Sequence, residues 1–187
     1  MRKLVIIAVV VVMAVSMGMG SAFAANDLQQ GKMGVSVGMG DSVFAHKTMP
    51  ESNGFVNDVV DINGRYFVAR DLAITGGFGL QLDGSDAKGT YISINGGVRK
   101  YLKVDDFAPF IGGQISLISN KVDSNNSITV IDLAAMFGAE YFFNKQFSLE
   151  GAIGAGLGTA DVKVAGKSST DTYIGTRTLG VRANFYF

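Results

Sequence analysis

The chain has 187 residues, with 16 basic and 16 acidic side chains, 25 glycines and no cysteine. The absence of cysteine excludes disulfides, thiolate metal sites and a cysteine-linked lipid anchor, and the balanced charge argues against nucleic acid as a partner. Without disulfides or thiolate metal sites, the stability of the fold must come from packing and hydrogen bonding, and 48% of the residues are apolar.

The N-terminal segment has the order of a secretory signal peptide. Arg2 and Lys3 precede the apolar run LVIIAVVVVMAV, which is followed by small residues and an alanine-x-alanine site that ends at Ala24. The run is shorter than the roughly 20 apolar residues that a membrane-spanning helix requires. We therefore predict that residues 1–24 are a signal peptide, cleaved after Ala24.

The remaining residues, 25–187, have the length of one domain and show apolar residues at every second position. In the first stretch, Met33, Val35 and Val37 alternate with glycine and serine. This period of two predicts β-strands, and no stretch has the spacing of an amphipathic helix. Eight strands are expected, at residues 32–40, 59–68, 72–83, 91–102, 109–119, 130–143, 147–158 and 172–187.

The connections between these strands alternate in length. Those after the second, fourth and sixth strands are tight (ARD, KVDD and NKQ), whereas those after the first, third, fifth and seventh are longer and polar (AHKTMPESNG, DGSDAKG, NKVDSNNS and DVKVAGKSSTD). This alternation predicts an all-β fold: a closed, eight-stranded, antiparallel up-and-down transmembrane β-barrel. Its short turns and both termini are expected at the periplasmic end.

The two faces of each expected strand differ in size. One face carries bulky aliphatic and aromatic residues, and the other carries mostly glycine, alanine and serine. The interior of an eight-stranded barrel has room only for side chains, so small residues inside and bulky residues outside suit a barrel surrounded by lipid. The alternative is a soluble all-β domain, because alternation alone does not say which face is wet. In the last strand the outward row is expected to hold Tyr173, Leu179, Val181, Ala183, Phe185 and Phe187.

A small set of charges falls on the inward rows, close to the short turns and the C terminus. This position places the set in one layer near the periplasmic mouth. The layer is either a gate for ions or a self-neutralising salt-bridge network that plugs the barrel. Since buried charges persist only when they are paired, we favour the network. Its expected members are Arg65, Arg99, Glu140, Glu150 and Arg182, with Gln114 among their neighbours.

Aromatic residues gather on the outward rows beside the short turns, where an interfacial girdle is expected. The girdle residues are Tyr66, Tyr141, Phe143 and Phe147, with Phe185 and Phe187 at the C terminus.

Two basic residues interrupt the lipid-facing rows. Lys100 lies close to a short turn, where a long basic side chain can extend to the interface. Arg177 lies deeper, and it faces lipid unless a β-bulge at residues 176–178 turns it inward.

The sequence shows no constellation of catalytic residues. The only histidine, His46, is expected on the first long loop without a serine partner, and the glycines of GAGLG lie along a strand with no following helix to bind a phosphate. We therefore predict that the protein is not an enzyme and holds no metal or cofactor. Lysines in the long loops could pair with lipopolysaccharide phosphates, although the same loops hold acidic residues.

The signal peptide, the eight strands, the alternating turn and loop lengths and the terminal Phe187 resemble the small outer-membrane β-barrels of Gram-negative bacteria. This class contains outer-membrane proteins A and X and the "porin family" barrel domains. The resemblance implies export through the periplasm to the cell outer membrane, contact with outer-membrane lipid and lipopolysaccharide, and a structural or surface-interaction role. The alternative role is a narrow channel for ions or very small solutes. The resemblance also implies a C-terminal signal for the barrel-assembly machinery, carried by Thr178, Gly180, Ala183, Phe185 and Phe187.

Overall fold

The computed structural model describes residues 28–39, 42–45, 61–82, 90–121 and 124–187. The predicted signal peptide and His46 lie outside these ranges. Within the described residues, no helix is long and apolar enough to cross a membrane.

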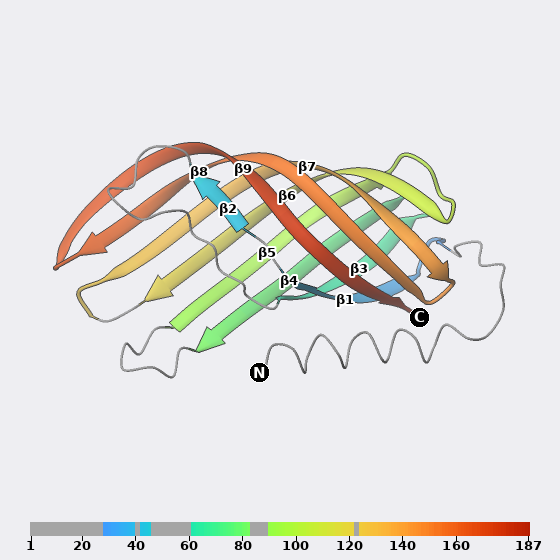
Figure 1. The fold of residues 1–187 in the computed structure, drawn as a ribbon, viewed down its shortest axis with the longest axis horizontal. Coiled ribbons are helices and arrows are strands. Elements are labelled where there is room, and N and C mark those ends of the chain that lie inside the picture. Colours follow the sequence, from blue (N-terminus) through green and yellow to red (C-terminus); the bar gives the residue numbers. More distant parts are fainter. Residues whose placement is uncertain (1–27, 40–41, 46–60, 83–89, 122–123) are drawn as a thin grey trace.

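Antiparallel β-strands make up nearly all of the described chain (Figure 1). They are β1 (Met33–Met39), β2 (Ser42–Ala45), β3 (Asp61–Ala69), β4 (Leu72–Leu82), β5 (Thr90–Tyr101), β6 (Phe107–Lys121), β7 (Ser127–Asn144), β8 (Phe147–Val164) and β9 (Lys167–Tyr186).

The strands form a closed wall. From β3 to β9 each strand pairs with the next, and β1 pairs with both β3 and β9. β1 and β2 follow one another along β9 in a continuous register, from Met39 opposite Val181 to Ser42 opposite Thr178, so together they form one of the eight strands of the wall. Closure gives each of the eight strands of the wall a hydrogen-bonded neighbour on both sides, which a barrel in hydrocarbon requires; within the described residues the β2 part pairs with β9. The predicted closed, eight-stranded antiparallel barrel is confirmed.

The last hairpin differs from the expected long loop at residues 161–171. β8 continues to Val164, β9 begins at Lys167, and only Ala165 and Gly166 separate them. Their φ angles of 49° and 79° are those of a type I′ hairpin turn. Valine and threonine favour extended backbone, so this polar stretch remains paired as strand rather than forming a loop.

The two faces of the wall have the predicted polarity. Outward residues such as Phe78, Ile94 and Leu133 expose more than half of their surface, whereas the inward Asn63 and Ser116 are buried. The bulky apolar side chains therefore cover the outside of the barrel, and its small and polar residues line the inside.

A β-bulge in β9 reverses this pattern for part of the strand. Gly151 pairs with Val181 but Ile153 pairs with Thr178, so β9 contains one extra residue at this point, and Gly180 has a φ of 60°. Beyond the bulge Ile174 is 75% exposed and Tyr173 only 5%. The prediction that Tyr173 faces outward is therefore wrong, because the extra residue shifts the alternation by one position.

The bulge lies between Thr178 and Val181 rather than at the expected residues 176–178. The side chain of Arg177, like those of residues 178 and 179, lies outside the described part of the chain.

Candidate functional site

The turns after β3, β5 and β7 lie with the C terminus at one end of the barrel, here called the turn end (Figure 1). The turns are residues 70–71, 102–106 and 145–146. The inward positions close to this end hold the largest group of buried charges in the described chain.

The five predicted interior charges come from five different strands and meet inside the barrel. All five are at least 94% buried. Glu140 on β7 lies opposite Glu150 on β8, which in turn lies opposite Arg182 on β9. Arg65 on β3 and Arg99 on β5 reach the two glutamates across the interior.

Glu150 is the carboxylate that all three arginines approach. Its Oε2 lies 2.7 Å from Arg65 Nη2 and 2.6 Å from Arg99 Nη1. Its Oε1 accepts a second bond from Arg99 Nη2 at 3.1 Å and lies 3.9 Å from Arg182 Nη1. The contact with Arg99 is therefore bidentate, which is the strongest geometry for such a pair.

Glu140 is held by a wider set of donors. Arg65 Nη1 donates to it at 2.8 Å, and the hydroxyls of Tyr101 and Tyr186 donate at 2.6 Å and 2.5 Å. Asn184 Nδ2 donates at 3.0 Å, and Ser148 Oγ donates as well. Five donors compensate for the complete removal of this carboxylate from water.

Sequence reasoning did not assign these four polar partners to the layer. Tyr101, Ser148, Asn184 and Tyr186 all occupy inward positions near the turn end, so the signal was their place on the same rows as the charges. Three of them are tyrosine or asparagine, and these residue types do not by themselves indicate a place beside a buried carboxylate. Only the stagger of the strands brings them to Glu140.

A third carboxylate completes the network. Asp61, four residues before Arg65 on the same face of β3, accepts a bond from Arg182 Nη2 at 2.6 Å and is buried. The network therefore contains three arginines and three carboxylates and carries no net charge. Gln114, expected as a neighbour, instead donates to Ser116 at 3.1 Å.

A layer of aromatic rings lies between the network and the turn end. We call it the aromatic floor. Phe67, Tyr101 and Phe142 are each two positions nearer the turn end than a network residue on the same strand. Tyr186 is four positions nearer than Arg182, and Phe110 lies on β6. Phe67 and Tyr101 stack with ring centroids 5.6 Å apart, and Phe142 and Tyr186 lie 5.5 Å apart. The guanidinium of Arg99 lies 3.9 Å from the centroid of Phe110, a cation–π contact. The floor consists of Phe67, Tyr101, Phe110, Phe142 and Tyr186.

The predicted girdle residues lie on the outer surface beside the turn end. Tyr66, Tyr141 and Phe143 are about half exposed, but Phe147 is only 6% exposed. The rings of Phe143 and Phe185 flank Phe147 at centroid distances of 5.5 Å and 5.2 Å. Phe147 therefore packs within an aromatic row rather than standing free at the surface.

The residues of the expected assembly signal lie along the end of β9. Gly180 forms the bulge described above, Ala183 is buried, and Phe185 packs on Phe147. Phe187 is 68% exposed, and its backbone exchanges hydrogen bonds of 3.0 Å and 3.2 Å with Met33. The side chain of Thr178 lies outside the described residues.

Lys100 has a partner at the turn end. It lies on the outward row of β5, is half exposed, and donates to the Asp71 carboxylate in the turn after β3. This hydrogen bond holds the pKa of Asp71 below its ordinary value of 3.8. The pair explains how a lysine is accommodated on a lipid-facing row close to an interface.

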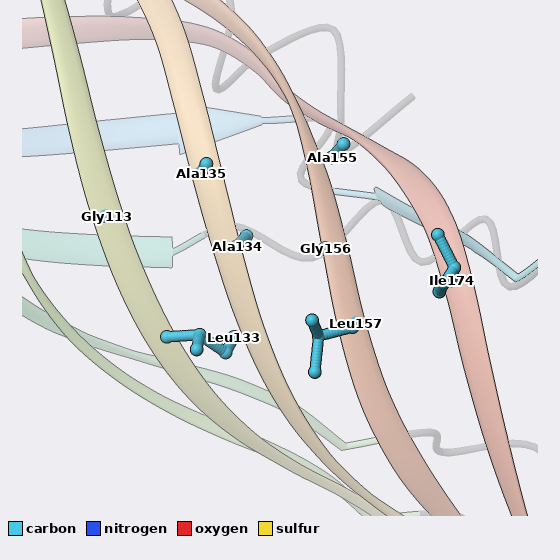
Figure 2. Close-up of a pocket in the computed structure, with 8 residues that line it drawn as sticks. All are labelled: Gly113, Leu133, Ala134, Ala135, Ala155, Gly156, Leu157 and Ile174. Carbon is cyan, nitrogen blue, oxygen red and sulfur yellow. The ribbon is translucent and has the colours of Figure 1, made fainter.

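The outer wall has a shallow apolar hollow of about 430 Å³ on β6 to β9 (Figure 2). Small residues form its base and Leu133, Leu157 and Ile174 its rim. Among the described residues no group of acidic or histidine side chains could hold a metal ion.

The fold is similar to that of solved outer-membrane barrels. The outer membrane protein OprG from Pseudomonas aeruginosa matches with a TM-score of 0.53 and 11% identity, over 85% of this chain and 97% of that one. The outer membrane protein AlkL, solved by solid-state NMR in lipid bilayers, matches with a TM-score of 0.54 and 12% identity, over 90% of this chain and 97% of that one. No protein-family model and no curated protein matches the chain. The chain has the fold of the small eight-stranded outer-membrane barrels.

Proposed function

We propose that the protein is an outer-membrane β-barrel with a structural or surface-interaction role, whose interior is closed by the ion-pair network. The observation that carries the proposal is the composition of the network. Its three arginines and three carboxylates neutralise one another across the barrel, inside the described wall. Because the charges of this neutral layer are paired with one another, the layer offers no line of unpaired charges along which an ion could pass.

The outer surface supports placement in a membrane. A soluble monomer rarely exposes a contiguous apolar patch larger than a few hundred Å², yet large apolar side chains are exposed on every strand from β3 to β9. A soluble barrel would instead turn these residues toward its core. The aromatic row beside the turn end then lies at the periplasmic interface, where tyrosine and phenylalanine rings are favoured.

The closed interior supports a role for the barrel wall and its loops rather than for transport. The charges are held by charge-assisted hydrogen bonds of 2.6 Å to 3.1 Å, apart from the longer contact of Arg182 with Glu150. Replacing these contacts with a passing ion would leave buried charges unpaired, which costs several kcal/mol (about 3–5) for each pair broken. The aromatic floor adds a second, apolar layer on the same path.

One observation favours the narrow channel as a second candidate. Asp61 Oδ1 and Asn95 Oδ1 are buried without a hydrogen-bond partner in the described chain. Buried polar atoms of this kind usually bond to water, and water inside the barrel above the network would be the start of a path for ions.

Planar-bilayer recordings of the refolded protein separate the two candidates. A closed interior gives no reproducible unitary steps, either in the wild-type chain or in an outer-wall control such as Leu133→Ala. Unitary steps whose size changes when Glu140 or Arg182 is replaced would overturn the closed interior and favour the channel.

The proposed partners are outer-membrane lipid and lipopolysaccharide, and the barrel-assembly machinery during export. Phe187 supports the last of these because its ring is exposed at the end of β9. Deleting Phe187 removes one exposed ring, so we expect a larger loss of outer-membrane protein in cells than of stability in the refolded barrel. Wild-type levels of the deletion variant in the outer membrane would contradict the assembly role.

A further inference from the structure

The residues before β1 lie at the turn end of the barrel. Leu28 is only 3% exposed, whereas the next three residues, Gln29, Gln30 and Gly31, are exposed. Leu28 lies five residues before the start of β1, where no strand pairing covers it. Its burial therefore needs a specific cause.

The cause is a tight turn. Lys32 N donates to the carbonyl of Gln29 at 3.1 Å, and Gly31 has a φ of 87°. These are the features of a type II β-turn, whose third residue needs a positive φ and is therefore usually glycine. Gly31 N also donates to the carbonyl of Phe67 at 2.8 Å, which attaches the turn to β3.

The turn directs Leu28 into the aromatic floor. Leu28 belongs to the same buried cluster as the five floor residues and Ala108, and Val104 in the turn after β5 packs against this cluster. The floor lies between Leu28 and the ion-pair network, because Phe67 and Phe142 are two positions nearer the turn end than Arg65 and Glu140. Leu28 thus joins the buried cluster from the segment before β1, at the turn end.

We propose that residues 28–32 form a strap across the turn end of the barrel, and that the buried side chain of Leu28 closes this end to water. The inference rests on the proposed closed interior, since it names the element that keeps periplasmic water away from the network. Water that entered through the floor would raise the local dielectric and weaken the ion pairs. The strap is a separate device from the network, because Leu28 and the residues of its turn up to Gly31 carry no charged side chain.

The absence of cysteine from the chain allows a direct test by thiol labelling. The variants Leu28→Cys, Gln29→Cys and Gln30→Cys are refolded separately and treated with a water-soluble maleimide. Because burial of a leucine-sized side chain must be undone before the thiol can react, we expect labelling roughly 10- to 100-fold slower in Leu28→Cys than in the other two. Equal rates at the three positions would overturn the strap.

A second experiment asks whether Leu28 is the seal itself. Ala108→Cys places a thiol in the same buried cluster as Leu28 and the floor residues, at a position where the native side chain is fully buried. Adding Leu28→Ser should speed its labelling by about tenfold or more, whereas adding Gln30→Ser, a change at an exposed position of the same turn, should leave the rate unchanged. Unchanged labelling in the Leu28→Ser background would contradict the seal.

Folding and the proposed function are checked independently. A shift between boiled and unboiled samples on a gel identifies the variants that fold, and Leu28→Ala is the milder replacement if Leu28→Ser does not. Unitary conductance of the wild-type chain would contradict the closed interior, whereas equal thiol reactivity at positions 28 to 30 contradicts the strap alone.

Discussion

The inner and outer faces of the barrel wall can be compared where two glycines follow one another along a strand. β4, β5 and β6 each contain such a pair. A Cβ atom on the inward glycine of each pair would lie less than 3.0 Å from a neighbouring atom, whereas on the outward glycine it would meet nothing closer than 3.7 Å. The pairs, inward residue first, are Gly77 and Gly76, Gly97 and Gly96, and Gly112 and Gly113.

This difference shows that steric fit restricts the residues of the inner face more than those of the outer face. The inner face must fit side chains from all strands into a small closed volume, so both the size and the charge of each residue matter. On the outer face, a Cβ atom at these positions would make only ordinary van der Waals contacts, at 3.7 Å or more. We infer that the outer face needs only to be apolar.

The largest effect is expected from breaking the inner network. Glu150→Gln removes one carboxylate and leaves three arginines with only Asp61 and Glu140. Because an unpaired charge remains buried, the free energy of unfolding should fall by about 3–5 kcal/mol. Urea unfolding of the refolded barrel measures the change.

A double variant provides the control for this prediction. Arg99→Met combined with Glu150→Gln restores equal numbers of buried positive and negative charges, so part of the lost stability should return. If Arg99→Met costs as much stability in the Glu150→Gln background as it does in the wild-type chain, charge balance is not the cause.

A charge placed on the outer face tests the membrane side of the comparison. Leu133 lies on the outward row of β7 and exposes 55% of its surface. In a bilayer, Leu133→Arg should lower the free energy of unfolding by about 2–4 kcal/mol if the residue lies near the midplane. Thr129→Arg, nearer the loop end of the same row, should cost less. Equal stability of both variants and the wild type would contradict a lipid-facing wall.

The glycine pairs test the steric side of the comparison. In Gly97→Ala the new methyl group meets the Gly113 carbonyl and cannot be accommodated without moving backbone, so we expect a loss of about 1–3 kcal/mol. In Gly96→Ala the methyl group meets only the Thr75 carbonyl, at an ordinary contact distance of 3.9 Å, and reduced flexibility of the unfolded chain should give a gain of up to about 1 kcal/mol. Similar urea midpoints for the two variants would contradict the comparison.

The smallest effect concerns the exposed pair at the turn end. The Lys100 hydrogen bond lowers the folded-state pKa of Asp71, so Asp71 stabilises the fold above its unfolded pKa and this contribution is lost as the pH falls through the folded pKa. NMR titration should therefore find Asp71 below 3.8, its ordinary value, and Lys100→Met should raise it. An unchanged pKa in that variant would show that another group causes the shift.

Much of the fold follows from local patterns. The period of two identifies the strands, and the alternation of short and long connections gives their number and their up-and-down order. The five interior charges could be selected for the same reason: position along one strand determines which face a residue occupies. The pattern did not reveal the polar partners of Glu140. Tyr101 and Tyr186 come from β5 and β9, and neither of these strands is a neighbour of β7, which carries Glu140.

Two other features depend on the backbone conformation of a single glycine. The bulge at Gly180 shifts the alternation by one residue, and this shift places Tyr173 inside the barrel against the simple pattern. Glycine is common throughout the chain, so the sequence carried no mark that distinguished the bulge glycine from the others. The turn at Gly31 likewise looked like any polar segment before a strand.

The amino-acid sequence by itself determined the number of strands, the positions of the turns after β3, β5 and β7 and, except beyond the bulge in β9, which residues share a face of each strand, because these are properties of neighbouring residues. Only the tertiary structure decided which charges pair, that Asp61 balances Arg182, and that Leu28 reaches the aromatic floor. These contacts depend on the stagger between strands and on closure of the barrel, and both are set by the packing of all strands together.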